Sequence, residues 1–307
     1  MESWRALGGV GAGRRATVII VTVLTILLAF GCAPQQPPGP PSGKVIVAVG
    51  DIASCSSTAD EVTARLVGVI DGSTVLTLGD NAYESGAPSE FSQCYNPTWG
   101  RFKDRTKPVP GNHEYDTAEA KGYFGYFGKA AGKPGKGYYS YELGQWHIVA
   151  LNSNCEEVGC TASSPQVKWL EADLAKDAKT CTLAYFHYPL FSSGEYRPGI
   201  HEVKPLWEDL YDADVDVVLN GHDHNYQRFA PQDPNGKADP QRGIREFVVG
   251  TGGRSHYSIL GPIANSEVYN DETYGVLKLT LRPESYEWRF LPVEGETFTD
   301  SGSARCH

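Results

Sequence analysis

The stretch TVLTLGDNAY, residues 74–83, runs from β-branched and aliphatic residues directly into Gly79 and Asp80. A short apolar run that ends at such a turn predicts a buried strand followed by a loop. Polar residues follow predicted strands in the same way at four other places: Gly50-Asp51, Gly111-Asn112-His113-Glu114, His187 and Gly221-His222-Asp223-His224. Open α/β sheets place their sites at the carboxyl ends of strands, so we predict one shared site there.

Strands and helices alternate along residues 44–307, which we interpret as one domain of the α/β class. The composition agrees, with 40% hydrophobic residues and 34 glycines. We predict helices at 58–70, 165–176 and 203–211, the first opened by a capping box at Thr58–Glu61. We predict strands at 44–49, 74–78, 107–109, 182–186, 215–219, 245–249, 274–281 and 285–291, and a hairpin formed by 138–141 and 145–151.

The donors in these segments are carboxylate, amide, phenol and imidazole groups, and none is a thiolate. Such donors suit hard or borderline cations that activate water, rather than a closed structural zinc site. Each segment alone has an ordinary explanation: Asp51 in a turn, Asp80 as a helix cap, or His187 as a buried core histidine. Five such segments at five strand ends favour a site for two metal ions.

The first residues of the chain have the features of an export signal. Arg5, Arg14 and Arg15 precede an apolar run at 16–30, which is short for a membrane span of about 20 residues. The run ends in Ala29-Phe30-Gly31-Cys32, which resembles the lipobox of bacterial lipoproteins, where the cysteine is acylated after cleavage. We therefore predict a lipoprotein-type signal peptide at 1–32 and a proline-rich linker at 33–43. An ordinary signal peptide or an uncleaved anchor is the alternative.

Cysteine content also favours export. Apart from Cys32 the chain has an even set of cysteines, which predicts up to three disulfides in an exported protein: Cys55, Cys94, Cys155, Cys160, Cys181 and Cys306. Cys155 and Cys160 lie close enough in sequence to form the first predicted pair. The formal net charge is −10 and no basic run occurs, so we expect no nucleic acid as a structural partner.

Together these segments resemble the calcineurin-like metallophosphoesterase superfamily, and specifically its purple acid phosphatase branch. The resemblance covers residues 50–228 and implies an αββα four-layer sandwich, in which helices flank two mixed β-sheets. Most of the superfamily carries Asp-x-His at the first motif, whereas this chain has Asp51-Ile52-Ala53. Tyr83 stands where the purple acid phosphatases use a phenolate ligand, and this exchange indicates the branch.

The resemblance implies the role of each residue. Asp51, Tyr83 and His224 would bind the first metal, which the resemblance implies is Fe³⁺, and Asp80 would bridge to the second. Asn112, His187 and His222 would bind the second metal, which would be Zn²⁺, Fe²⁺ or Mn²⁺. His113 would act as the general acid or orient the phosphate, together with the catalytic ligands Asp80 and Asn112. Arg197 and His201 are the candidates for substrate binding. Glu114 would pack against the metal ligands or form hydrogen bonds with them.

The function implied is an exported, lipid-anchored hydrolase that cleaves phosphate monoesters by attack of metal-bound hydroxide. Its partners would be a phosphorylated small-molecule or protein substrate, and the outer face of the cell membrane through lipidated Cys32. A phosphodiesterase or nucleotidase on the same metal core is an alternative, because the surrounding loops decide between them. A non-catalytic cell-surface binding protein is the alternative outside enzymes.

Overall fold

The structure is a computed structural model that describes Gly13 and residues 43–177 and 179–307. The predicted signal peptide at 1–32, including Cys32, and the predicted linker at 33–43 lie outside the described residues, apart from Gly13 and Gly43. Among the helices that the structure describes, none is long and apolar enough to cross a membrane.

The first sheet has six strands in the order β15-β14-β13-β1-β3-β5. They are β1 (Lys44–Val49), β3 (Thr74–Leu78), β5 (Thr106–Val109), β13 (Gly275–Arg282), β14 (Ser285–Pro292) and β15 (Ser301–Arg305). β1, β3 and β5 run parallel, whereas β13 joins β1 antiparallel with Lys44 opposite Leu281. The parallel half therefore brings three strand carboxyl ends to one edge.

The second sheet has seven strands in the order β12-β10-β11-β9-β8-β7-β6. They are β6 (Tyr139–Leu143), β7 (Trp146–Ala150), β8 (Cys181–Tyr185), β9 (Val217–Asn220), β10 (Tyr226–Phe229), β11 (Arg245–Val249) and β12 (Ser266–Asn270). β7, β8, β9 and β11 are parallel neighbours. Two short strands, β2 (Ala53–Ser54) and β4 (Ala82–Tyr83), pair next to the first sheet.

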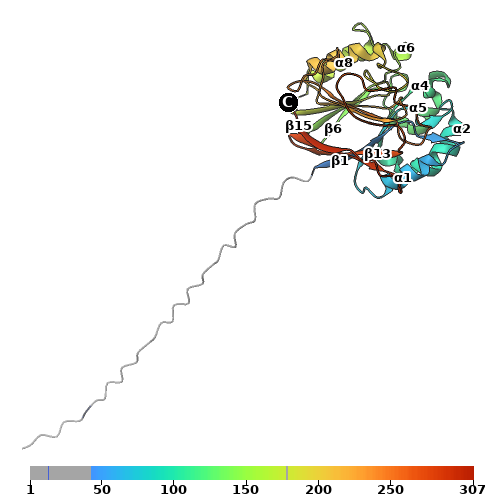
Figure 1. Ribbon diagram of the computed structural model, residues 1–307, viewed down its shortest axis with the longest axis horizontal. Helices are drawn as coiled ribbons and strands as arrows, with labels where there is room; N and C mark the ends of the chain where they lie inside the picture. The colour runs from blue at the N-terminus through green and yellow to red at the C-terminus, as the bar shows by residue number, and fades with distance from the viewer. Residues whose placement is uncertain (1–12, 14–42, 178) are drawn as a thin grey trace, which may run out of the picture. The chain divides into compact units, whose positions relative to one another are not determined.

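Helices cover the outer face of the second sheet and part of the outer face of the first, and the two sheets lie between them (Figure 1). The α-helices are α1 (Ala59–Gly68), α2 (Pro88–Glu90), α3 (Asn96–Thr98), α4 (Asn112–Tyr115), α5 (Lys121–Phe127), α6 (Cys155–Val158), α7 (Pro165–Leu174) and α8 (Lys204–Asp212). Short 3₁₀ or π segments are η1 (Phe91–Tyr95), η2 (Trp99–Arg105), η3 (Ala118–Ala120), η4 (Gly128–Ala131) and η5 (His201–Val203).

The hydrophobic core has two parts. The larger part includes Ile46 of β1, Leu277 of β13 and Phe247 of β11, so it fills the space between the two sheets and continues under α1. The smaller part joins α7 and α8 to the outer face of the second sheet through residues such as Val218 and Trp207. The predicted four-layer sandwich of two mixed sheets and flanking helices is confirmed.

Most predicted strands lie within one or two residues of their observed bounds, and the hairpin forms with Leu143 opposite Trp146. The capping box at Thr58 is wrong, because its side chain makes no cap hydrogen bond. Ser57 supplies the acceptor instead, since its Oγ accepts from the N–H of Ala59 at 3.1 Å.

The six described cysteines form three disulfides: Cys55–Cys94, Cys155–Cys160 and Cys181–Cys306. The predicted Cys155–Cys160 pair is therefore confirmed. It closes a loop around α6.

Candidate metal centre

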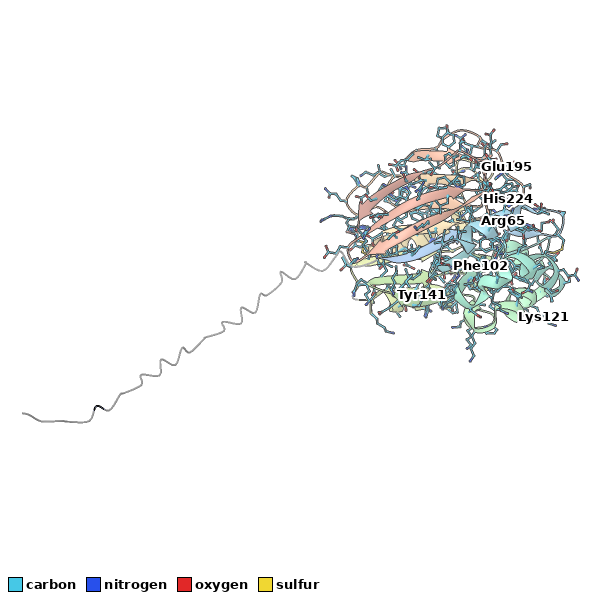
Figure 2. The ribbon with its side chains drawn as sticks, turned by 90° about the horizontal axis from the view of Figure 1, so that it is seen from below. Arg65, Phe102, Lys121, Tyr141, Glu195 and His224 are labelled. Atoms are coloured by element: carbon cyan, nitrogen blue, oxygen red, sulfur yellow. A yellow bond between two sulfur atoms is a disulfide. The ribbon has the colours of Figure 1, made fainter. Side chains whose placement is uncertain are left out.

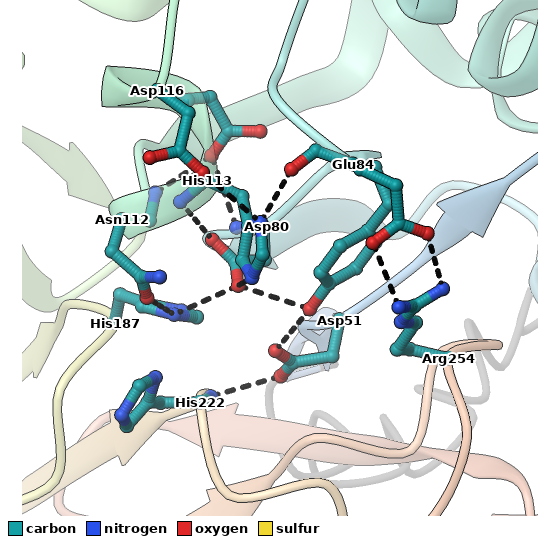
Figure 3. A network of polar contacts seen from close by, with 12 residues as sticks. Asp51, Asp80, Glu84, Asn112, His113, Asp116, His187, His222 and Arg254 are labelled. Carbon is teal, nitrogen blue, oxygen red and sulfur yellow. Dashed lines mark hydrogen bonds and ion pairs between the residues drawn. The ribbon is translucent and has the colours of Figure 1, made fainter.

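The predicted site residues meet where strands of both sheets end. Asp51 follows β1, Asp80 follows β3, and Asn112 opens α4 after β5, all from the first sheet. From the second sheet, His187 follows β8, and His222 follows β9. Backbone bonds join the ends directly, for example from the N–H of Asp51 to the carbonyl of Gly79 at 3.1 Å. Figure 3 shows these side chains pointing toward one another.

One group of donors surrounds the phenol of Tyr83. Its oxygen lies 2.9 Å from Asp51 Oδ1, 2.9 Å from Asp80 Oδ2 and 3.2 Å from His224 Nε2. His224 Nε2 is also 3.3 Å from Asp51 Oδ1. Tyr83 is therefore part of the cluster, as the exchange at the first motif predicts.

A second group gathers around His187. Its Nε2 lies 3.2 Å from Asn112 Oδ1 and 3.3 Å from Asp80 Oδ2. Asp80 Oδ2 thus lies between the Tyr83 group and the His187 group. This is the position expected of a carboxylate shared by two sites.

His222 joins the cluster through both its backbone and its ring. Its N–H donates to Asp51 Oδ2 at 2.9 Å, and its ring centroid lies 5.0 Å from that of His187. His222, Asp51 and Asp80 all have positive φ angles, of 70°, 60° and 48°. This backbone region is energetically unfavourable for residues other than glycine, and residues that adopt it are often found at functional sites.

Carbonyl groups fix how two of the imidazoles face the cluster. His187 Nδ1 lies 2.8 Å from the carbonyl oxygen of Leu78, and His224 Nδ1 lies 2.7 Å from that of Ser255. A carbonyl only accepts, so each Nδ1 carries a proton and each Nε2 faces the cluster, where a cation that displaces any proton on it could bind. Metal-binding histidines are usually held in this way.

The charges in the cluster fit a bound cation. Asp51 and Asp80 are 0% and 1% exposed, and among the described residues no lysine or arginine forms an ion pair with either. Buried carboxylates need a positive partner. Oxygens of both carboxylates and a ring nitrogen of His187 lie within 4.8 Å of one another. Hard oxygen donors mixed with imidazoles suit iron, zinc or manganese, so these residues fit the predicted metals.

Burial and neighbouring charges shift the pKa values within the cluster. Burial raises the pKa of Asp80, but the nearby His187 outweighs this effect and leaves the pKa below its usual range. Burial, and then the charge of His187, lowers the pKa of His222, so its ring is neutral and can act as a ligand. Burial, and then Asp51 and Asp80, raises the pKa of Tyr83, so the phenol keeps its proton until a cation replaces it.

His113 stands at the edge of the cluster and is half-buried. Its Nδ1 donates to the carbonyl of Glu84 at 2.5 Å, and its Nε2 lies 3.9 Å from Asp80 Oδ2. The ring therefore presents Nε2 beside the ligands without being one of them. This position suits a group that exchanges a proton with substrate or orients a phosphate oxygen.

Two further residues hold the ligand loops in place. Glu114 is fully buried, and its carboxylate accepts from the N–H groups of Asp80, Asn81 and Gly111 at 3.0, 2.8 and 2.7 Å. Arg254 donates to both carboxylate oxygens of Glu84 at 2.6 and 2.8 Å, and its guanidinium lies 4.8 Å from the centre of the Tyr83 ring.

Sequence reasoning missed Arg254. The tight Gly250–Gly253 connection directly before it was a signal that could have located it.

A cavity of about 580 Å³ opens beside the cluster, and Asn112 and His222 form part of its wall. Arg197 and His201 are exposed and are not among its lining residues, so their role in substrate binding stays a prediction. Tyr196, next to Arg197, does line the cavity and packs 4.0 Å from the His222 ring, centroid to centroid. Figure 2 shows Glu195 of this loop and His224 toward the same end of the molecule.

A two-sheet sandwich with a buried aspartate and histidine cluster at its strand ends defines a class of metal-dependent hydrolases. Residues 44–226 match the family described as calcineurin-like phosphoesterase, and the chain belongs to this family. It is a metallophosphoesterase related to the purple acid phosphatases.

Individual relatives support this placement. Purple acid phosphatase 15 of Arabidopsis thaliana is 30% identical over 260 residues, which cover 73% of this chain and 47% of that protein. The chain spans about half the length of the curated relatives it matches.

Two solved structures share the fold. A purple acid phosphatase from yellow lupin (Lupinus luteus) seeds has a TM-score of 0.68 at 20% identity, over 87% of this chain and 55% of that one. GAP50, the anchor in the inner membrane complex of Plasmodium, has a TM-score of 0.65 at 14% identity, over 87% of this chain and 90% of that one.

Proposed function

We propose that this protein hydrolyses phosphate monoesters with the aid of two metal ions. Asp51, Tyr83 and His224 would hold the first ion, and Asp80 would be shared with the second. The second ion would be held by Asn112, His187 and His222, the remaining donors of the cluster. The similarity to purple acid phosphatases favours monoesters as the substrate class.

The position of one oxygen carries this proposal. Asp80 Oδ2 lies 2.9 Å from the Tyr83 phenol and 3.3 Å from His187 Nε2, between two otherwise separate sets of donors. A phenol with two carboxylates favours Fe³⁺ in the first set, and an amide with two imidazoles suits Zn²⁺, Fe²⁺ or Mn²⁺ in the second.

Two bound cations would screen the charge of a phosphoryl group and make water a stronger acid. The protein's own residues position the reaction. Asn112 lies on the cavity wall, where its amide can orient a substrate phosphate. His113 presents Nε2 3.9 Å from Asp80 Oδ2, beside the ligands, and can give a proton to the departing alkoxide there.

The test compares turnover of an aryl phosphate monoester with that of a bis-aryl diester by the full chain. Asn112→Ala removes a cluster residue, and Asn235→Ala, on the exposed surface, is the matched control. We expect a preference for the monoester that Asn112→Ala abolishes and Asn235→Ala keeps. A preference for the diester would reassign the protein as a phosphodiesterase. Metal-replete, folded protein that cleaves neither ester would refute hydrolysis.

We also propose that the protein is exported and held at the outer face of the cell membrane through a lipid on Cys32. Three disulfides support export, because such bonds persist in oxidising compartments. Incorporation of labelled palmitate in cells, compared with that of Cys32→Ser, tests the anchor. Equal labelling of the two chains would rule the anchor out.

A further inference from the structure

The cavity beside the metal centre has an unusual charge for a site that receives a phosphate ester. Its volume of about 580 Å³ is that of a small-molecule site. Asn112 and His222 line it, so the reacting phosphate would enter at that end. The rest of the cavity would then hold the alcohol part of the substrate.

Four carboxylates line this cavity and no lysine or arginine does: Asp116, Glu156, Glu157 and Glu202. Asp116 Oδ2 lies 3.5 Å from the Nδ1 atom of His113. In the described part of the chain, no lysine, arginine or histidine forms an ion pair with Glu156, Glu157 or Glu202. The alcohol part of the substrate therefore meets carboxylates that no lysine or arginine of the described chain neutralises.

This acidic wall is built into the fold. Glu156 and Glu157 lie on α6, which the Cys155–Cys160 disulfide closes at its base. Cys155 Sγ also lies 3.5 Å from the carbonyl oxygen of Glu202, which brings α6 next to the 3₁₀ segment η5. The two segments that carry Glu156, Glu157 and Glu202 are therefore held next to each other, and these three residues are exposed on the wall.

Aromatic rings complete the cavity. Tyr115, Tyr188 and Tyr196 line it, and the last two pack against His222 with ring centroids 4.5 and 4.0 Å from its own. Tyrosine faces attract organic ammonium groups through cation–π interaction. Carboxylates and tyrosines around one small cavity form a site suited to a cation.

We propose that the site selects phosphate monoesters whose alcohol carries an ammonium group, such as phosphocholine or phosphoethanolamine. The proposal rests on the phosphatase function proposed above. The phosphate would lie at Asn112 and His222, and the ammonium group would lie among the carboxylates and tyrosines. A second phosphate or a carboxylate on the alcohol would be repelled, so nucleoside polyphosphates would be poor substrates.

The test compares kcat/KM of the full chain for phosphocholine and for its neutral carbon isostere, in which a quaternary carbon replaces the nitrogen. The two esters have the same shape, so their ratio reports charge alone. We expect phosphocholine to be favoured about tenfold or more, the size of a cation–π contact with nearby carboxylates. In Glu156→Gln/Glu157→Gln the ratio should fall severalfold. The control Glu171→Gln/Glu272→Gln removes the same charge from exposed positions outside the cavity and should keep the ratio.

A binding measurement separates this proposal from the phosphatase function. Choline and its neutral carbon isostere are titrated calorimetrically into the full chain without added metal, and choline should bind more tightly. Hydrolysis of both esters at equal efficiency would overturn the selection and leave the phosphatase function standing. An unchanged ratio in Glu156→Gln/Glu157→Gln would also overturn it. If no ester is cleaved and choline binds no better than its isostere, both proposals fail.

Discussion

Glu114 offers the sharpest test of how the site is held together. Its Oε1 accepts from the N–H groups of Asn81 and Ala82 at 2.8 and 3.3 Å, and its Oε2 accepts from those of Asp80 and Gly111 at 3.0 and 2.7 Å. One buried carboxylate thus joins the loop after β3 to the loop after β5. Glu114→Gln keeps the shape but replaces one accepting oxygen by an NH₂ group, which can only donate.

The loss of stability in Glu114→Gln follows from the number of backbone N–H groups that are left without an acceptor. Whichever way the amide turns, two buried backbone N–H groups face its NH₂ group. A buried donor without a partner costs about 1–3 kcal/mol, so Glu114→Gln should lower the free energy of unfolding by about 4 kcal/mol. Because Asp80 is held by this network, affinity for metal should fall roughly 10- to 100-fold as well.

Glu90 provides the matched control. Its carboxylate also accepts backbone N–H groups, from Glu84, Ser85 and Ala87 at 2.6, 3.0 and 2.8 Å, but it lies near the surface. Water can replace the lost acceptor there, so Glu90→Gln should cost about 1 kcal/mol or less. Urea unfolding with a chelator present measures both variants without a contribution from metal. Equal costs for the two substitutions would refute the argument that burial sets the penalty.

Three other perturbations test separate parts of the structure. His113→Ala should leave the metal content unchanged and lower kcat roughly 10²- to 10⁴-fold, and unchanged kcat would remove His113 from the chemistry. Gly111→Ala places a methyl group against the Asp80 carboxylate and should reduce metal content, whereas Gly125→Ala, whose added methyl meets no atom within 4 Å, should not. Burial raises the pKa of Glu246 in the folded protein well above its ordinary value of 4.5. The contribution of protonated Glu246 to the free energy of unfolding is therefore complete below pH 4.5, and it is lost as the pH rises toward the pKa of the folded state. The free energy of unfolding of Glu246→Gln should therefore rise relative to the native chain from pH 5 to 8, and a difference independent of pH would contradict this.

The sequence predicts the parallel strands well because their side chains are buried on both faces. The run at 44–49 is apolar after Lys44 and that at 245–249 is apolar after Glu246, and their predicted bounds equal those of β1 and β11. β15 was missed because its five residues, SGSAR, show no apolar alternation. The short helices α2 and α3 were missed as well, since three residues are too few to show a helical period.

The candidate ligands were predictable for a topological reason. Parallel strands bring their carboxyl ends to one edge, so residues far apart in sequence, such as Asp51 and His222, were expected to meet. The supporting groups were less accessible to sequence reasoning. The carbonyls of Leu78 and Ser255 that orient His187 and His224 belong to the backbone, which no residue type reveals.

The loops that shape the cavity depend on contacts between distant segments, and this limits what sequence can say about substrate. The N–H of Tyr188 donates to Ser153 Oγ at 2.9 Å, and Cys155 Sγ meets the carbonyl of Glu202. Each contact joins the segment after β7 to the segment after β8, and these segments contain only short helical turns that show no long pattern in the sequence. The metal centre can therefore be common to a family while these loops set the charge that a substrate meets. In this chain the side chains of the loops that line the cavity are negatively charged. The metal ligands would therefore determine the bond that is cleaved, and the loops would determine the substrate from which the phosphate is removed.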